Sequence, residues 1–323
     1  MAPYFISHFY KRSFMSAQDD SQSLTQTATS APATTPVRHT HNNVASAYLY
    51  IVATPIGNMG DITARAIDTL KQVDIIACED TRTSGKLLAN FGIDTQTWAY
   101  HEHNSEIQTP KIIEMIQRGH SVALISDAGT PLISDPGYQL VQAAHAAGVG
   151  VVPIVGASAA IAALSVAGLP SDKFSFVGFL PAKTHGRVKQ LEQYIERTET
   201  LIFYEAPHRI VVSLKDMASV FGDNRPATLC RELTKTFETV KKSTLGELAQ
   251  FVEADNNQQK GEIVLVVGGN VNNDSDDDSI HDELLLRLLQ DLSVKKAAAL
   301  ASELTGVKKN TLYQRLLDLQ KSE

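Results

Sequence analysis

Two carboxylates in a loop rich in glycine and proline are the side chains of this sequence best placed for chemistry. Residues 126–137 read Ser-Asp-Ala-Gly-Thr-Pro-Leu-Ile-Ser-Asp-Pro-Gly and follow a short apolar run. Two Pro and two Gly in this stretch require a tight turn with special backbone dihedrals. Asp127 and Asp135 could contact a ligand, or they could brace the loop by accepting hydrogen bonds from its backbone N–H groups. The residues alone leave a ligand loop and an ordinary turn both open.

Similar polar or glycine-rich clusters follow other strand-like runs in the first half of the chain. They lie at 54–60, 79–82 and 101–104, after runs that begin at Tyr48, Asp74 and Thr97. Helical spacing fills the intervals, and Asp61 is predicted to cap a helix that runs to about Lys71. Alternating strands and helices favour a mostly parallel sheet with helices on both faces. The clusters would then meet at the carboxyl edge of that sheet, where open α/β sheets bind ligands.

The pattern predicts an α/β protein with two domains and a C-terminal helical unit. A parallel-sheet α/β domain is expected at 47–155 and a smaller α+β domain at 156–270, with strands at 174–179, 201–205, 227–232 and 262–267 and helices at 188–197, 209–221 and 245–254. Residues 1–46 include a long Ser-, Thr-, Gln- and Pro-rich stretch and are predicted to be disordered, with Met15 as an alternative start. An acidic linker is predicted at 271–279.

The tail, residues 280–323, has the pattern of short helices around a turn at Gly306, which is typical of a helix-turn-helix unit. Its core is expected from Leu300, Leu304, Val307, Leu312, Leu316 and Leu317. Within 295–315 the basic residues Lys295, Lys296, Lys308, Lys309 and Arg315 face a single acidic residue, Glu303. A local basic face of this kind favours contact with nucleic-acid phosphates. A small packing or dimerising bundle with solvated lysines is the alternative.

Composition narrows the class of protein. The chain has 323 residues, 43% of them hydrophobic, and a formal net charge of −7. The hydrophobic residues are numerous enough to form a core. Because the chain as a whole is acidic, any contact with nucleic acid must come from a local basic patch. Cys78 and Cys230 lie in apolar runs and are expected as buried, reduced thiols rather than as a disulfide. A membrane helix needs about 20 apolar residues. With neither such a run nor a recognisable secretory signal, a cytoplasmic location is expected.

Seven short motifs occur in order along the chain. They are Thr54-Pro55-Ile56-Gly57-Asn58, Glu79-Asp80-Thr81-Arg82, Ser126-Asp127-Ala128-Gly129-Thr130-Pro131, Asp135-Pro136-Gly137, Gly178-Phe179-Leu180-Pro181, Tyr204-Glu205-Ala206-Pro207-His208-Arg209 and Arg231-Glu232-Leu233-Thr234-Lys235. Together they resemble the tetrapyrrole methylase superfamily of S-adenosylmethionine-dependent methyltransferases over residues 48–269. The resemblance is greatest to its RNA-directed branch, which methylates a cytidine ribose 2′-hydroxyl in 16S ribosomal RNA of the small subunit. The basic tail agrees with that branch.

The resemblance implies that S-adenosylmethionine lies between the two domains, at the carboxyl edge of the first sheet. The residues assigned to its wall are Pro55, Gly57, Asp127, Ala128, Gly129, Thr130, Gly156, Ser158 and Ala159. The family usually has Gly-Pro-Ser or Gly-Pro-Cys where this chain has Gly156-Ala157-Ser158, and we expect a softer loop that still binds. The resemblance also implies a homodimer and, as partner, 16S ribosomal RNA or the 30S subunit.

A ribose 2′-hydroxyl is a poor nucleophile at neutral pH and needs a base or an acceptor as it attacks. Candidates at the expected cleft are Glu79, Asp80, His101, His103, Glu205, His208, Glu232, Lys235 and Glu238, of which Glu205, His208 and Lys235 are assigned as catalytic. Structural salt bridges of Glu205 with Arg209 and of Glu232 with Lys235 are the alternative. The residues assigned to RNA phosphates are Arg82, Arg209, Arg315 and the four tail lysines named above. His101-Glu102-His103 lacks a third well-spaced ligand, so no metal is expected.

Two other functions remain open on the sequence. A tetrapyrrole (precorrin) C-methyltransferase would share the fold and would not depend on the tail. A non-enzymatic regulator would bind nucleic acid through the tail and sense a ligand with its α/β body. The basic tail argues against the first function, and the seven motifs argue against the second.

Overall fold

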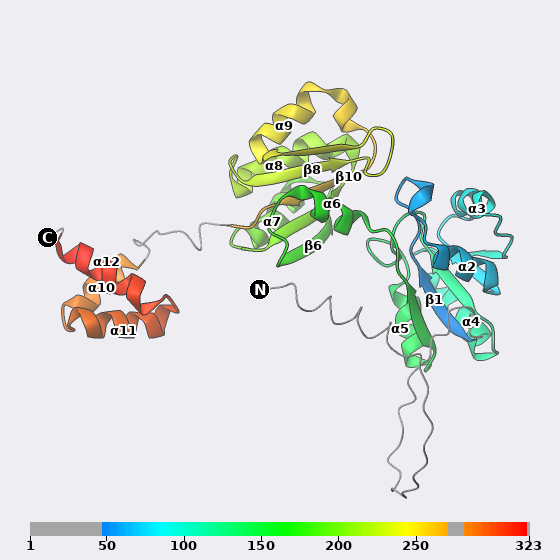
Figure 1. Ribbon diagram of the computed structural model, residues 1–323, viewed down its shortest axis with the longest axis horizontal. Coiled ribbons are helices and arrows are strands. Elements are labelled where there is room, and N and C mark those ends of the chain that lie inside the picture. The colour runs from blue at the N-terminus through cyan, green and yellow to red at the C-terminus, as the bar shows by residue number, and fades with distance from the viewer. Residues whose placement is uncertain (1–46, 271–280, 322–323) are drawn as a thin grey trace, which may run out of the picture. The chain divides into compact units, whose positions relative to one another are not determined.

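The computed structural model describes residues 47–270 and 281–321. In these ranges two five-stranded sheets are followed along the chain by three helices (Figure 1). The disorder predicted for 1–46 and the linker predicted for 271–279 lie outside the described residues. No helix in the two ranges is both long and apolar enough to cross a membrane.

The first sheet is parallel throughout, with the strand order β3-β2-β4-β1-β5. Its strands are β1 (Tyr48–Val52), β2 (Ile75–Cys78), β3 (Thr97–Ala99), β4 (Val122–Ile125) and β5 (Gly150–Ile154). Strands β2 and β4 are buried along their whole length, because helices cover both faces of the sheet. The alternation of strands and helices in the sequence predicted this arrangement, and the prediction is confirmed.

Two helices cover each face of the first sheet. These are α2 (Ala64–Gln72) and α3 (Thr81–Asn90) on one face, and α4 (Ser105–Gln117) and α5 (Tyr138–Ala146) on the other. Leu70 of α2 belongs to a buried cluster with Ile76 of β2, and Leu140 of α5 to one with Leu124 of β4. Each buried leucine stabilises the fold by about 1.5–3 kcal/mol relative to an exposed one. The helices therefore hold the strand ends, and the loops after them, in place.

Helix α2 begins later than the sequence predicted. Asp61 ends a short 3-10 turn, η1 (Met59–Asp61), and does not cap the helix. Ile62 is extended, and Thr63 is the N-cap, with its Oγ1 accepting from the N–H of Ala66 at 3.1 Å. Asp and Thr are both good N-cap residues, so helical spacing alone could not separate the two positions.

The second sheet is mixed, in the order β6-β7-β10-β8-β9. Its strands are β6 (Phe174–Phe179), β7 (Thr200–Glu205), β8 (Pro226–Arg231), β9 (Thr239–Thr244) and β10 (Ile263–Val267). Only β6 and β7 pair in parallel. One face packs on α7 (Thr184–Leu191), α8 (Ile210–Phe221) and α9 (Leu245–Ala254), and the other on α6 (Ala159–Ala167). Three short 3-10 turns complete this part: η2 (Glu192–Tyr194), η3 (Pro207–Arg209) and η4 (Asn256–Gln259).

Strand β9 is the one strand of this sheet that the sequence did not predict. Its residues are Thr-Val-Lys-Lys-Ser-Thr, and none of them is buried. It lies at the edge of the sheet and pairs only with β8. Backbone pairing therefore forms the strand, and no apolar alternation marks it in the sequence. Lysines at an edge strand also hinder unwanted pairing with other chains.

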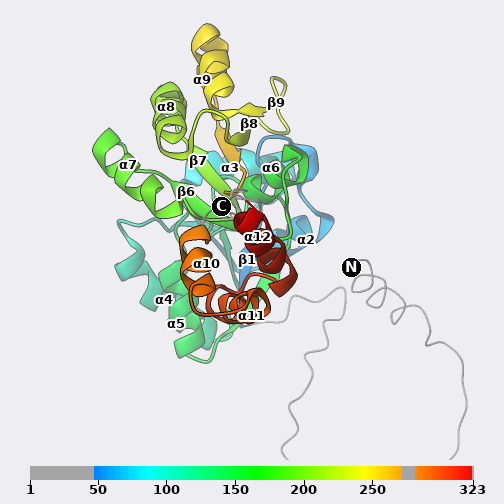
Figure 2. The ribbon, with the colours of Figure 1, turned by 90° about the vertical axis from the view of Figure 1, so that its left-hand side faces the viewer.

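The C-terminal helices α10 (Asp282–Leu289), α11 (Val294–Thr305) and α12 (Lys309–Lys321) pack on one another around a core of their own (Figure 2). Gly306, at φ +76°, makes the turn between α11 and α12. The core consists of Leu285, Ala297, Ala298, Ala301, Leu312 and Leu316. The prediction that Leu300 and Leu304 belong to it is wrong, since they are 38% and 65% exposed. Helix α11 presents its alanines inward, where small side chains let the helices approach closely.

Candidate active site

A cavity of about 430 Å³ lies where loops after the first sheet meet the second sheet. The loop after β4 supplies one wall, the start of α6 extends it, and the ends of β7, β8 and β10 supply the opposite side. The lining residues are Ile56, Asp127, Ala128, Gly129, Thr130, Ile133, Ser134, Asp135, Ser158, Ala159, Phe179, Tyr204, Glu205, Ala206, Pro207, Cys230, Leu233, Gly261, Glu262, Ile263 and Val264. Of the four polar or glycine-rich clusters of the sequence, 54–60 and 126–137 supply lining residues, and 79–82 and 101–104 do not.

The loop after β4 is held by backbone pairing with the end of β1. The N–H of Thr54 donates to the Gly129 carbonyl at 2.9 Å, and the N–H of Gly129 donates back at 3.0 Å. Thr130 Oγ1 donates to the Ala157 carbonyl at 2.9 Å, which ties the loop to the start of α6. Leu132 and Ser134 lie at φ +75° and +65°, a region that costs L-residues roughly 1–2 kcal/mol each. The surrounding contacts hold this loop in a conformation that it would not adopt alone.

Six of the nine residues assigned to the cofactor line this cavity: Asp127, Ala128, Gly129, Thr130, Ser158 and Ala159. Pro55, Gly57 and Gly156 are not among its lining residues. A Cβ on Gly57 would lie 2.4 Å from Lys235 Cγ, and one on Gly156 would lie 2.9 Å from Ala53 Cβ. Close packing with neighbours therefore accounts for glycine at these two positions.

Four carboxylates, and no Lys, Arg or His side chain, line the described walls of the cavity: Asp127, Asp135, Glu205 and Glu262. Burial raises the pKa of Asp135; a hydrogen bond from Ser126 opposes this increase, and the charge of Asp127 adds to it. Burial also raises the pKa of Asp127, against a hydrogen bond from the Asp80 N–H. Glu79 has a raised pKa through burial and then through Asp127 and Asp135. Glu205 is paired with Arg209 and Glu262 with Lys235, so the negative potential comes from Asp127 and Asp135, and it favours a positively charged ligand.

Glu205 ends β7, and its side chain is fully buried. Its Oε1 accepts from its neighbour's N–H, that of Ala206, at 2.7 Å and from Arg209 Nε at 2.5 Å. Its Oε2 has no hydrogen-bond partner among the described residues. The salt bridge with Arg209, the alternative to a catalytic role for Glu205, is therefore present, and it uses only one of the two carboxylate oxygens.

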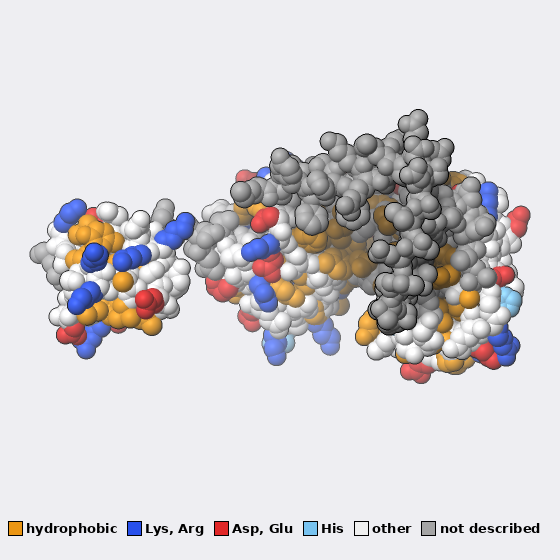
Figure 3. Space-filling model, turned by 60° about the horizontal axis from the view of Figure 1, so that its bottom comes forward, with side chains coloured by type: hydrophobic (Ala, Val, Ile, Leu, Met, Phe, Trp, Pro, Cys, Tyr) orange, Lys and Arg blue, Asp and Glu red, His pale blue; other side chains and the backbone are white. Residues whose placement is uncertain are grey.

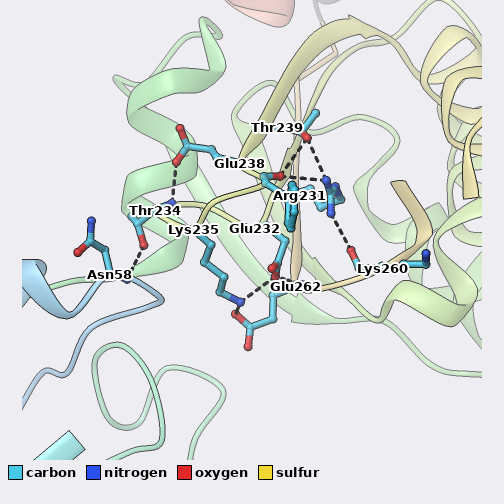
Figure 4. Close-up of polar contacts among 10 residues, drawn as sticks. Asn58, Arg231, Glu232, Thr234, Lys235, Glu238, Thr239, Lys260 and Glu262 are labelled. Carbon is cyan, nitrogen blue, oxygen red and sulfur yellow. Dashed lines mark hydrogen bonds and ion pairs between the residues drawn. The ribbon is translucent and has the colours of Figure 1, made fainter. Parts of the chain in front are cut away.

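The loop between β8 and β9 forms a polar network beside the cavity (Figure 4). Lys235 Nζ donates to Glu232 at 2.7 Å and to Glu262 at 2.9 Å. Thr234 Oγ1 accepts from the N–H of Asn58 at 3.1 Å, and so joins this loop to the segment that follows β1. Glu232 and Thr234 lie at φ +52° and +67°. Lys235, assigned as catalytic, is thus committed to two carboxylates and positions the cavity residue Glu262.

The other predicted residues lie outside the cavity lining. His208 is exposed in η3, and the Arg82 side chain is 88% exposed and pairs with Asp80. Lys295, Lys296, Lys308 and Lys309 are all exposed on the helical unit, where Figure 3 shows blue basic side chains beside orange apolar ones. Arg315 donates to Asp282 at 2.8 Å and 2.6 Å, an ion pair that joins α12 to α10. In the described ranges no group of three or more His, Cys, Asp or Glu residues is placed to hold a metal ion.

Comparison with known families identifies the fold. The family Tetrapyrrole (Corrin/Porphyrin) Methylases matches residues 48–249. The chain belongs to this family. A second family, described as RsmI C-terminal HTH domain, matches residues 273–320 of this methylase. The expected superfamily is confirmed. The methyltransferase class and S-adenosylmethionine as methyl donor are confirmed with it.

Curated relatives cover nearly the whole methylase. It is 54% identical over 275 residues to a protein of Pseudomonas aeruginosa named ribosomal RNA small subunit methyltransferase I, a match that covers 84% of this chain and 97% of the relative. A protein of the same name from Escherichia coli O157:H7 is 48% identical over 283 residues, covering 88% and 99%. The crystal structure of uroporphyrin-III-C-methyltransferase from Thermus thermophilus has a TM-score of 0.51 at 20% identity, covering 69% and 94%, and shares the fold.

The cavity of this methylase fits S-adenosylmethionine on its own geometry. Its volume, about 430 Å³, lies in the range of small-molecule sites. Asp127 and Asp135 suit a sulfonium charge, whereas the other two carboxylates are paired, Glu205 with Arg209 and Glu262 with Lys235. A Cβ on Gly129 would lie 3.4 Å from Ile56 Cγ2, so any larger side chain there would take up room in the cavity. We would place the cofactor against Gly129 and Thr130 on one side and Ser158 and Ala159 on the other.

Several lining residues escaped the sequence assignment. Phe179 and Tyr204 stand inside motifs that the sequence already marked, and their rings meet edge to face at 5.6 Å. Gly261 and Glu262 stand in no motif. They reach the cavity only because β10, the last strand in sequence, pairs between β7 and β8. That strand order is a long-range property and leaves no local trace in the sequence.

Proposed function

We propose that the protein transfers a methyl group from S-adenosylmethionine to the ribose 2′-hydroxyl of a cytidine in 16S ribosomal RNA. The observation that supports S-adenosylmethionine as the bound cofactor is the cavity, whose walls include the carboxylates of Asp127 and Asp135 and no described basic side chain. Ribosomal RNA as the substrate is supported by the names of the relatives and by exposed lysines on α11 and α12. The alternative, methylation of a tetrapyrrole carbon, has support from the name of the matched family and from a structure that shares the fold at 20% identity, and the curated relatives cited above do not carry that name.

The chain's own residues supply binding, orientation and exclusion of water. When bound, the cofactor supplies an activated methyl group on a positively charged sulfur. The loop after β4, pinned by Thr54 and Thr130, shapes one wall, and Phe179, Tyr204 and Leu233 give the other an apolar surface. Fixed geometry and water exclusion are the main contributions a protein can make to an in-line displacement. Of the three assigned catalytic residues, only Glu205 lines the cavity.

RNA contact is assigned to exposed cations outside the cavity. Arg82 on α3 and Lys295, Lys296, Lys308 and Lys309 on the helical unit are exposed. Arg209 and Arg315 are weaker candidates for contact with RNA phosphates, because each already donates to a carboxylate of its own chain. Phosphate contacts of this type orient the RNA and carry no sequence information. The protein is proposed to act in the cytoplasm, where its ribosomal substrate is found.

We further propose that the protein is a homodimer and that α6 contributes to the interface. The exposed residues of α6 are Ile161, Ser165 and Val166, with Ile161 and Val166 52% and 49% exposed. Val155, shortly before the helix, is 73% exposed. A helix that is apolar on its outer face as well as its inner face is usually covered. A second copy of the chain would cover it.

Methyl transfer with labelled S-adenosylmethionine tests the function. The substrates are purified 30S subunits and, separately, naked 16S ribosomal RNA, both from a strain that lacks the enzyme, and a precorrin as the alternative acceptor. We expect label in RNA, on an alkali-stable ribose position. Label on a base would reject the proposed chemistry. Label in the precorrin alone would establish the alternative function.

A further inference from the structure

We propose that Phe179 stacks against the cytosine base of the target nucleotide and so positions its ribose at the cavity. Phe179 stands on β6, the edge strand of the second sheet, and it is 54% exposed although it lines the cavity. Ile133, at 39%, is the other large apolar side chain of the described lining that is exposed. Both side chains are therefore accessible to a molecule that enters from solvent. This inference rests on the proposed function.

A shift in strand register turns Phe179 toward the cavity. Between Phe176 and Gly178, strand β6 has one residue more than its partner β7. In an unbroken strand Phe176 and Phe179 would lie on opposite faces of the sheet. After the shift both rings contact the ring of Tyr204, with centroids 4.9 Å and 5.6 Å away. A β-bulge of this kind often lies beside an active site, where it redirects a side chain.

Gly178 permits this shift and brings β6 against the loop after β4. It lies at φ +75°, which glycine adopts without strain. A Cβ at this position would lie 3.4 Å from Ser134 Oγ, so the strand and the loop are in close contact there. Ile133 precedes Ser134 in the loop, and Phe179 follows Gly178 in the strand. The two exposed apolar side chains of the lining therefore belong to segments that touch beside the cavity.

An exposed aromatic ring at this place suits a nucleobase. Unpaired RNA bases are recognised largely by stacking on aromatic side chains. Phe179 has no polar atom for a phosphate or a hydroxyl, and its edge-to-face contact with Tyr204 favours a fixed orientation of the ring. The cofactor is placed against the loop after β4 and the start of α6, which leaves Phe179 for the acceptor. A cytosine stacked there would hold its ribose next to the cavity.

Phe179→Leu removes the aromatic face and keeps an apolar side chain at a half-exposed position. We expect kcat/KM for 30S subunits or 16S ribosomal RNA to fall by about tenfold, the loss of one stacked base. Cofactor affinity measured by calorimetry should be unchanged. Phe179→Tyr keeps the ring and should keep kcat/KM close to the wild-type value. The matched control is Phe174→Leu, because Phe174 is 42% exposed on the same strand and does not line the cavity.

A second measurement tests whether the base is the partner of Phe179. Once the methylated nucleotide is mapped, 16S ribosomal RNA is prepared with an abasic ribose at that position, which retains the 2′-hydroxyl. It is reconstituted into 30S subunits if naked RNA is not a substrate. If Phe179 stacks on the base, wild-type protein and Phe179→Leu become equally slow on the abasic RNA. A tenfold difference that persists on the abasic RNA would reject the stacking contact.

Three other results would overturn the proposal. The first is an equal kcat/KM for Phe179→Leu and Phe174→Leu. The second is a loss of cofactor affinity in Phe179→Leu, which would show that the ring contacts the cofactor. The third is a change of mass from dimer to monomer in light scattering, which would show that a second copy covers the ring. Failure of the proposed function is distinct, because the wild-type protein would then label neither 30S subunits nor 16S ribosomal RNA, and the contact with a target cytosine would be rejected with it.

Discussion

At the scale of single residues, Gly129 offers a clear test of where the cofactor lies. It stands at φ +81°, and a larger side chain there would occupy the cavity wall beside Ile56. We expect Gly129→Val to abolish measurable cofactor binding by calorimetry. The matched control is Gly119→Val, because Gly119 lies at φ +98° with no heavy atom within 4 Å of its Cβ position. Both variants carry the same backbone strain, roughly 1–2 kcal/mol, so a shared effect would point to strain and not to the cavity.

The acidity of Asp135 predicts how cofactor binding depends on pH. Its pKa is raised above the ordinary value of 3.8, chiefly by burial, so in the window above 3.8 the folded protein holds a proton that the unfolded chain has lost. As the pH falls through the raised pKa, the carboxylate becomes neutral and its attraction for a sulfonium is lost. We expect cofactor affinity to fall as the pH is lowered through that raised pKa, with proton release on binding in the same range. Calorimetry in buffers of different ionisation enthalpy measures both.

Asp135→Asn is the companion variant for this pH dependence. It should bind the cofactor more weakly at neutral pH and show a flatter pH profile, because the titrating charge is gone. If its profile is as steep as that of the wild-type protein, another group near the cavity controls the titration. Asp127 and Glu79 would be the next residues to replace, since both also have raised pKa values.

At the scale of elements, the sequence predicted the helices, strands and loops that are marked by nearby residues. Helices α5 and α9 begin where their apolar spacing begins, at Tyr138 and Leu245. The start of α2 was predicted two residues too early because Asp61 and Thr63 are both favourable N-cap residues, and helical spacing does not separate them. Strand β9 was missed because an exposed edge strand needs no apolar alternation. The loop 126–137 was recognised from its turn residues, whereas Gly261 and Glu262 reach the cavity through strand order alone.

Helix α6 is predicted to form part of a dimer interface. Ile161 is 52% exposed on its outward face, and a charge there would be buried if a second copy covers the helix. We expect Ile161→Glu to shift the protein from dimer to monomer in light scattering coupled to size exclusion. Ile107→Glu on α4, at a side chain that is 63% exposed, is the control and should leave the mass unchanged. A wild-type protein that is already monomeric would refute the proposed interface.

At the scale of the whole molecule, the proposed cofactor site and the helical unit proposed to bind RNA depend on different parts of the fold. The proposed cofactor site combines partly buried acids, strained backbone and strand ends from two sheets, and all of these need the complete fold. The helical unit needs only its own core, since Leu285, Ala297, Ala298, Ala301, Leu312 and Leu316 all lie within it. Local periodicity was therefore enough to predict its helices, and it was not enough to predict the cavity. The protein is acidic overall, with a net charge of −7, so attraction for RNA has to be concentrated in such a unit.

The double variant Lys308→Ala/Lys309→Ala tests whether this unit binds RNA phosphates. Both lysines are exposed at the start of α12, where the helix dipole adds to their positive charge. Each phosphate contact contributes roughly 0.7–0.9 to the slope of log affinity against log salt, so two lost contacts should lower that slope by about 1.4–1.8. Cofactor affinity should be unchanged, because neither lysine lines the cavity. The control Lys71→Ala/Lys111→Ala removes the same charge from exposed positions on α2 and α4. An equal loss of slope in both double variants would mean that overall charge, and not this unit, attracts the RNA.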